Sequence, residues 1–239
     1  MFRLEDLFRL QHEALLSNLS SDKVTELLGF VRDFAGLITD TLESLDFADP
    51  AKKTVIRILA VDSLSSLLVA CRAGLWGNVP EAAVLIRTAL ETLTILTCLV
   101  EEGAFRAFDF EMRSRLRRFS YVACHTRLGD RGQRVNSLHG KLSDVGGHTS
   151  RNRLKFAEFK KDGVGYDRFG CAADADASEM ALLLIPDALQ HLAGNLREAY
   201  VQERRAYPME ERHAELNARY VQFIRTRDAE SEGTASQDS

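Results

Sequence analysis

The sequence predicts an all-α protein: a bundle of six to eight helices with an antiparallel central helix pair and one small β-hairpin. Two long, mostly apolar segments, Ala51–Arg72 and Asn78–Glu102, are joined by the short connection GLWGNVP. Such a short connection makes them antiparallel neighbours. The stretch 151–170 instead has two groups of apolar and aromatic residues around a Lys-Lys-Asp-Gly turn, which favours a hairpin.

Asn78–Glu102 is the most apolar stretch of the chain and should be its best-buried helix. Pro80 and Glu81 suit a first helical turn, where a missing N–H costs nothing and a carboxylate meets the positive end of the dipole. Gly103 is a natural C-terminal stop. Apolar residues fall on nearly every face of this segment, which is typical of a core helix.

The remaining helices are predicted from apolar residues at helical spacing and from their end signals. Residues 1–228 should form a single helical domain, with a hairpin excursion at about 151–170. Residues 229–239 are polar and small and should be a disordered tail. The other expected helices are Phe2–Leu19, Lys23–Leu45, Ala104–Leu128, Gln133–Val145, Glu179–Ala206 with a kink or restart at Pro186, and a last one from Pro208 to about Arg227.

A polar stripe interrupts the apolar central helix. Arg87 and Glu91 are one turn apart and can pair. Asp62, on the preceding helix, lies about as far before the connection as Arg87 lies after it. The sequence therefore predicts a buried Asp62–Arg87–Glu91 cluster, because a buried charge requires a partner. Such a cluster is either a structural ion-pair network or the floor of a ligand or catalytic pocket.

Charge is unevenly distributed along the chain. The net charge is −4, yet residues 104–161 contain 14 Lys and Arg against 5 Asp and Glu. A basic segment on an acidic frame indicates a surface for RNA or another anionic ligand. The alternative is that these cations pair with acidic helices of the same fold.

Other sequence features indicate where in the cell the protein is expected to lie. We find no signal peptide, no membrane-spanning segment and no paired cysteine spacing, so we expect a cytoplasmic protein with reduced, buried thiols. The chain has no phosphate-binding glycine loop and no metal motif, so we expect no cofactor and no metal.

Two motifs resemble known helical families. An Arg-x-x-x-Glu core helix, followed by a short helix that ends near His148, resembles a group of poorly characterised bacterial helical proteins. The segment Arg134-Val-Asn-Ser-Leu-His139 resembles the motif of the HEPN superfamily, in which an arginine precedes a histidine by a few residues; Arg118 and His125 also fit this spacing.

The HEPN resemblance implies a metal-independent endoribonuclease of a defence or toxin-type system, with its site built across a homodimer. His139 would act as general base or acid on a ribose hydroxyl, and Arg134 would stabilise the phosphate charge. The alternative hypothesis is a non-catalytic interaction or small-ligand-binding module. That module would bind a partner protein or a small ligand through the hairpin and the polar stripe. His148 lies beside Arg151 in a polar junction. It would either complete the pocket at Arg87 and Glu91 or join the RNA site, although it also suits a local turn. A small-molecule enzyme is a third possibility.

Overall fold

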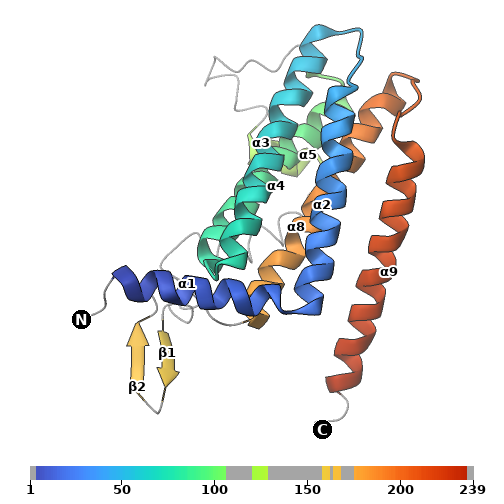
Figure 1. The fold of residues 1–239 in the computed structure, drawn as a ribbon. Helices are drawn as coiled ribbons and strands as arrows, with labels where there is room; N and C mark the ends of the chain where they lie inside the picture. Colours follow the sequence, from blue (N-terminus) through green and yellow to red (C-terminus); the bar gives the residue numbers. More distant parts are fainter. Residues whose placement is uncertain (1–3, 106–119, 129–157, 162–163, 168–174, 236–239) are drawn as a thin grey trace.

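The computed structural model describes residues 4–105, 120–128, 158–161, 164–167 and 175–235. Seven α-helices dominate these residues, so the predicted all-α class is confirmed (Figure 1). Two short strands, β1 (Glu158–Lys161) and β2 (Val164–Asp167), pair antiparallel. The helices are α1 (Leu4–Leu19), α2 (Asp22–Glu43), α3 (Pro50–Leu75), α4 (Val79–Glu102), α5 (Tyr121–Arg127), α8 (Ala175–Gln202) and α9 (Glu210–Ala235).

Local signals explain the helix ends. The side chains of Ser21 and Asp49 accept hydrogen bonds from the first backbone N–H groups of α2 and α3, which have no partner within the helix. Gly103 ends α4 with a φ of 61°, a left-handed conformation that glycine adopts without strain. α9 continues to Ala235, past residue 229, where the sequence predicts the tail to begin. The predicted helix Gln133–Val145 and residues 106–119 lie outside the described residues.

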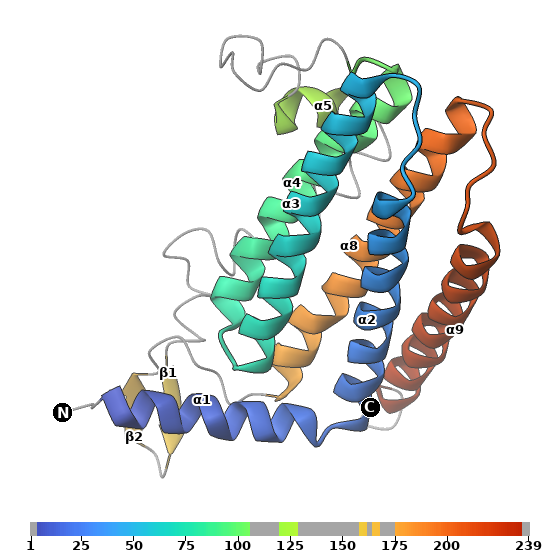
Figure 2. The same ribbon diagram turned by 45° about the horizontal axis from the view of Figure 1, so that its top comes forward.

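The centre of the bundle is α8. It packs against α2, α3 and α4, while α3 and α4 lie side by side as an antiparallel pair (Figures 1 and 2). α4 is the most apolar of these helices, as expected, but α8 makes contact with more of the other helices. Fully buried aliphatic side chains from all four form one core, among them Leu27, Leu37, Ile56, Leu67, Ile86, Leu93, Leu96, Leu182, Ile185 and Leu189.

Two helices flank this four-helix core. α1 crosses its lower end, where buried Asn18 donates a hydrogen bond from Nδ2 to the carbonyl of Leu75, 2.9 Å away. α9 runs antiparallel to both α2 and α8 along the outside of the bundle (Figure 2). Its side chains, described below, link it to both neighbours.

A buried lysine joins the start of α3 to the end of α8. Lys52 Nζ donates to the carbonyl of Ala199 at 2.8 Å and pairs with Glu203 at 3.1 Å. The ring centroids of Phe47 and Phe105 lie 4.5 and 5.4 Å from the ammonium. Buried charge of this kind is tolerated because oxygen atoms and aromatic faces replace water.

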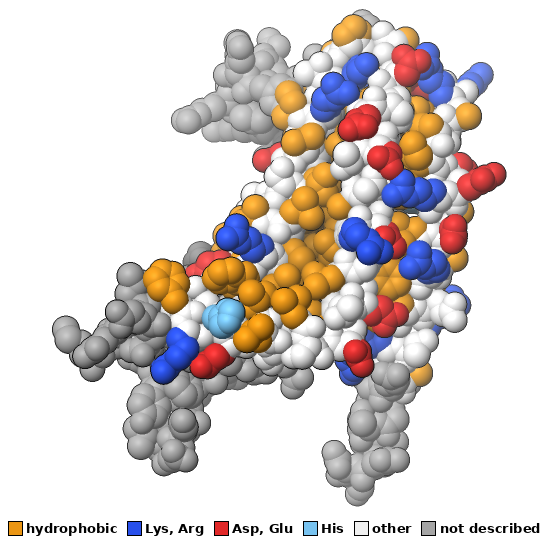
Figure 3. Space-filling model, in the orientation of Figure 1, with side chains coloured by type: hydrophobic (Ala, Val, Ile, Leu, Met, Phe, Trp, Pro, Cys, Tyr) orange, Lys and Arg blue, Asp and Glu red, His pale blue; other side chains and the backbone are white. Residues whose placement is uncertain are grey.

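Within the described residues, α3 and α4 are each long and apolar enough to cross a membrane, by length and composition alone. The apolar window of α4 is 61% buried inside the bundle, as expected of a core helix, whereas that of α3 is 44% buried. The outward face of α3 accordingly exposes large apolar side chains, which adjoin others on α1 (Figure 3). They are Ile58, Val61, Leu68 and Val69 on α3, and Phe8, Leu16 and Leu19 on α1.

Candidate functional site

The polar stripe of α4 forms only in part as predicted. Arg87 Nε pairs with Glu91 Oε1 at 3.1 Å, but the two side chains are 31% and 36% exposed. Asp62 is exposed and accepts a hydrogen bond from Thr92 Oγ1 at 3.2 Å. The prediction of a buried Asp62–Arg87–Glu91 cluster is therefore wrong.

The geometry of the connection explains this correction. α3 runs on to Leu75, beyond the predicted end at Arg72, and this moves the turn. Thr92, not Arg87, then lies level with Asp62. Asp62 also sits on the outward face of α3 beside the exposed Val61, so its carboxylate reaches water.

Helix α5 brings a phenol to the Arg87–Glu91 pair. Burial raises the pKa of Tyr121, the charge of Glu91 raises it further, and the charge of Arg87 opposes the rise. Ser120 fixes the start of α5 by accepting a hydrogen bond from the Ala123 N–H at 3.3 Å. The remaining predicted site residues, Arg134, His139, His148 and Arg151, lie outside the described residues.

The seam between α8 and α9 is a ladder of polar side chains. Tyr220 donates its hydroxyl to Asp187 Oδ1 at 2.7 Å, and the Gln190 amide donates to Asn217. Further along, Arg197 pairs with Glu210 at 2.8 Å. The antiparallel register of this ladder places Gly194 opposite His213. Because Gly194 has no side chain, the seam is open there.

This opening is a cavity of about 540 Å³ between α8 and α9. A Cβ atom added at Gly194 would meet no atom within 4 Å. His213 Nε2 is buried there and has no hydrogen-bond partner among the described residues. The cavity is lined by Asp187, Gln190, His191, Gly194, His213 and Asn217.

Ionisable groups at this seam have shifted pKa values. Burial lowers the pKa of His213 below 6.5, the nearby charge of Arg197 lowers it further, and Glu210 opposes the shift. Loss of solvent raises the pKa of Asp187, while the hydrogen bond from Tyr220 lowers it. Both shifts favour the uncharged form, so this cavity suits hydrogen bonding to neutral groups more than binding of ions.

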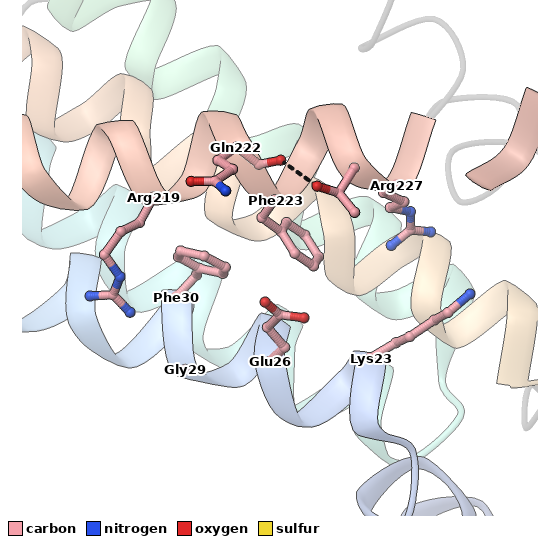
Figure 4. A pocket seen from close by; sticks show the side chains of 9 residues that line it. Lys23, Glu26, Gly29, Phe30, Arg219, Gln222, Phe223 and Arg227 are labelled. Carbon is pink, nitrogen blue, oxygen red and sulfur yellow. Dashed lines mark hydrogen bonds between the residues drawn. The ribbon is translucent and has the colours of Figure 1, made fainter. Parts of the chain in front are cut away.

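A second cavity, of about 600 Å³, lies on the other side of α9, against α2 (Figure 4). Phe30 from α2 and Phe223 from α9 point into it, with ring centroids 5.2 Å apart. A glycine again lies at its wall: a Cβ atom at Gly29 would meet nothing within 4 Å. The lining residues are Lys23, Glu26, Gly29, Phe30, Arg219, Gln222, Phe223, Thr226 and Arg227.

Cations stand at both ends of the α2–α9 cavity. Arg219 lies at one end, 5.8 Å from the Phe30 ring centroid and 3.5 Å from Asp33. Lys23 and Arg227 lie at the other end (Figure 4). Arg227 pairs with Glu179 at 2.8 Å through Nη2, whereas its Nη1 is buried without a hydrogen-bond partner in the described part of the chain. Three cations and one carboxylate, Glu26, therefore line a partly aromatic cavity.

Neither cavity was predicted from the sequence. The available signals were Gly29 and Gly194 in helix interiors, where glycine is otherwise unfavourable, and the arginines of α9. Among the described residues no group of His, Cys, Asp and Glu side chains is placed to hold a metal ion.

Comparison with known proteins does not assign this chain to a family. No protein family matches this chain, and neither does any curated protein or any solved structure.

Proposed function

We propose that this protein is a small-ligand-binding helical module, and that the cavity between α2 and α9 takes an organic anion with an apolar or aromatic body. The observation that carries this proposal is the cation-lined cavity itself, with Arg227 Nη1 buried and without a partner among the described residues. A buried donor without an acceptor is costly, and an anionic oxygen would satisfy it.

The size and lining of the cavity support this ligand class. Small-molecule sites are typically concave, about 300–1,000 Å³ in volume, mainly apolar, and contain a few polar groups that fix orientation. Here Phe30 and Phe223 supply the apolar surface, and Arg219 and Arg227 supply cations at opposite ends. Glu26 disfavours a highly charged ligand, so a monoanion such as an aromatic carboxylate fits better than a polyphosphate.

The test is calorimetric titration of the full chain with benzoate and indole-3-carboxylate, with benzamide as the neutral counterpart. Carboxylate binding should exceed benzamide binding. It should weaken roughly 10- to 100-fold in Arg227→Met, the equivalent of one charge-assisted hydrogen bond of about 1.5–3 kcal/mol. Arg225→Met is the matched control, because Arg225 is exposed on the same helix and does not line the cavity.

A second pair of variants locates the site. Gly29→Leu fills the α2–α9 cavity and should abolish binding, whereas Gly194→Leu fills the α8–α9 cavity and should leave it unchanged. Equal binding of benzamide and benzoate, or loss of binding only in Gly194→Leu, would contradict this assignment.

The excess of cations in residues 104–161 favours a second candidate, an RNA-acting protein. In this proposal Arg134 and His139, with His148 as a further candidate, form a metal-independent ribonuclease site across a homodimer. Purified protein should cleave RNA in EDTA and leave 2′,3′-cyclic phosphate ends, and both Arg134→Ala and His139→Ala should lose this activity. Intact RNA after incubation with folded protein of measured oligomeric state would contradict it.

A further inference from the structure

Two cysteines from different helices meet at the upper end of α4. Cys98 lies in the last turns of α4 and Cys124 lies in α5, and both are fully buried. One guanidinium nitrogen, Arg127 Nη2, lies 2.9 Å from Cys98 Sγ and 3.7 Å from Cys124 Sγ. Each thiol also influences the pKa of the other, which it lowers at Cys98 and raises at Cys124.

An ion pair covers these thiols. Arg127 Nε pairs with Glu102 Oε1 at 2.7 Å, and the two side chains are 33% and 27% exposed. The Cys98 thiol also donates to the same carboxylate oxygen at 3.5 Å. Both cysteines belong to the apolar core, but Cys98 Sγ also contacts Arg127 and Glu102, a pair of charged side chains that is partly exposed.

We propose that Cys98 and Cys124 are a redox-active dithiol that peroxide converts into a disulfide joining α4 to α5. A disulfide requires Cα atoms about 4.4–6.8 Å apart and an S–S bond of about 2.05 Å. The two sulfur atoms share one hydrogen-bond donor, at 2.9 and 3.7 Å, and this places them close enough together for the proposal to be tested.

The chemistry assigns the two sulfurs different roles. The Cys98 thiolate attacks one oxygen of hydrogen peroxide; an S–O bond forms, the O–O bond breaks, and the leaving hydroxide takes a proton to become water. The Cys124 thiolate then attacks the sulfenic sulfur of Cys98 and displaces hydroxide, which becomes the second water. Two thiols and one peroxide thus give one disulfide and two waters.

The thiol environments favour Cys98 as the attacking group. Burial raises the pKa of both thiols, that of Cys124 to about 12, but the hydrogen bond from Arg127 opposes the rise at Cys98. The guanidinium therefore stabilises the Cys98 thiolate. Because both thiols stay mostly protonated near neutral pH, the reaction should be slow there and should accelerate about tenfold for each pH unit.

Cys71 provides an internal control. It is a buried thiol on α3, and burial alone raises its pKa to about 11. Among the described residues no hydrogen bond joins its sulfur to another thiol or to a cation, so it lacks both features on which the proposal rests. It should remain a free thiol under conditions that oxidise Cys98 and Cys124.

The experiment treats the full wild-type chain with hydrogen peroxide, blocks free thiols with an alkylating reagent and maps the peptides by mass spectrometry. The expected result is one intramolecular Cys98–Cys124 peptide pair that dithiothreitol reverses, at a yield unchanged in Cys71→Ser and lost in both Cys98→Ser and Cys124→Ser. Disulfides that pair either residue with Cys71 or Cys171, sulfinic acid without a disulfide, or two thiols that stay reduced would overturn the proposal.

Discussion

Replacing a helical glycine with alanine should change stability in opposite directions at Gly29 and Gly74. Both glycines lie in helices, so the same methyl group is added to similar backbones. At Gly29, in the middle of α2, the new Cβ meets no atom within 4 Å. Alanine there restricts the unfolded chain without a packing cost, so the free energy of unfolding should rise by about 0.5–1 kcal/mol.

At Gly74 the packing term opposes this gain. The added Cβ would lie 3.2 Å from Leu182 Cδ2 and 3.4 Å from its Cγ. Leu182 is 1% exposed and is held by the core, so it has little room to move away. Overpacking of this kind costs roughly 1–3 kcal/mol. Gly74 also lies in the last turn of α3, where the gain from alanine is smaller, so we expect a net loss of about 1 kcal/mol.

Urea unfolding monitored by circular dichroism measures both changes, and m-values show whether the unfolded state also changes. Gly194→Ala, in the other open seam, is the matched control for Gly29→Ala and should stabilise by a similar amount. Destabilisation by Gly29→Ala, or stabilisation by Gly74→Ala, would refute the reasoning. The first result would mean that α2 and α9 pack too closely to leave a cavity.

Two further predictions concern buried ionisable side chains. Glu203→Ala should destabilise the protein by roughly 3 kcal/mol, because it leaves the buried ammonium of Lys52 without its carboxylate. Lys52→Met should cost only roughly 1 kcal/mol, because the Glu203 carboxylate that remains still reaches water. Thermal unfolding of both variants at one pH checks this order, and the reverse order would contradict it. Stability should also fall as the pH drops below 6.5, because the unfolded chain binds a proton that burial withholds from His213 in the folded state. Urea titrations between pH 8 and 5 should show a weaker fall for His213→Asn, but an unchanged one for the exposed control His12→Asn.

The elements with strong local signals were predictable. The apolar period of α2 and the end signals of α4, Pro80 and Glu81 in its first turn and Gly103 after its last, are contained in adjacent residues. The structure confirms them. The end of α3 was not predictable in this way: the expected segment stops at Arg72, whereas the helix continues to Leu75. This difference of a few residues was enough to pair Asp62 with Arg87 in the prediction and with Thr92 in the structure.

The cavities and the dithiol depend on contacts between distant segments. The spacing of apolar residues shows which face of α8 is polar, but it does not show that Gly194 faces His213. That contact depends on the register between α8 and α9, which are joined by a loop. Likewise, Cys98 and Cys124 lack the close spacing that marks a cysteine pair in a sequence, and their contact depends on how α5 folds back on α4. Side-chain sites of this kind require the tertiary register as well as the helix pattern.

Helix α9 forms one wall of each of the two cavities. Direct side-chain pairs hold it to α2 and α8, such as Arg219 with Asp33 and Tyr220 with Asp187. At Gly29 and Gly194 this contact is replaced by open volume, whereas at Gly36 of α2 the Arg212 guanidinium lies only 3.0 Å from where a Cβ atom would be. Between α2, α3, α4 and α8, by contrast, buried aliphatic side chains of the described residues form one packed core. A ligand bound in either cavity would contact both α9 and the neighbouring helix at a place where the two helices do not touch each other. Such a ligand would therefore stabilise the packing of α9 against the bundle more than the packing of the core.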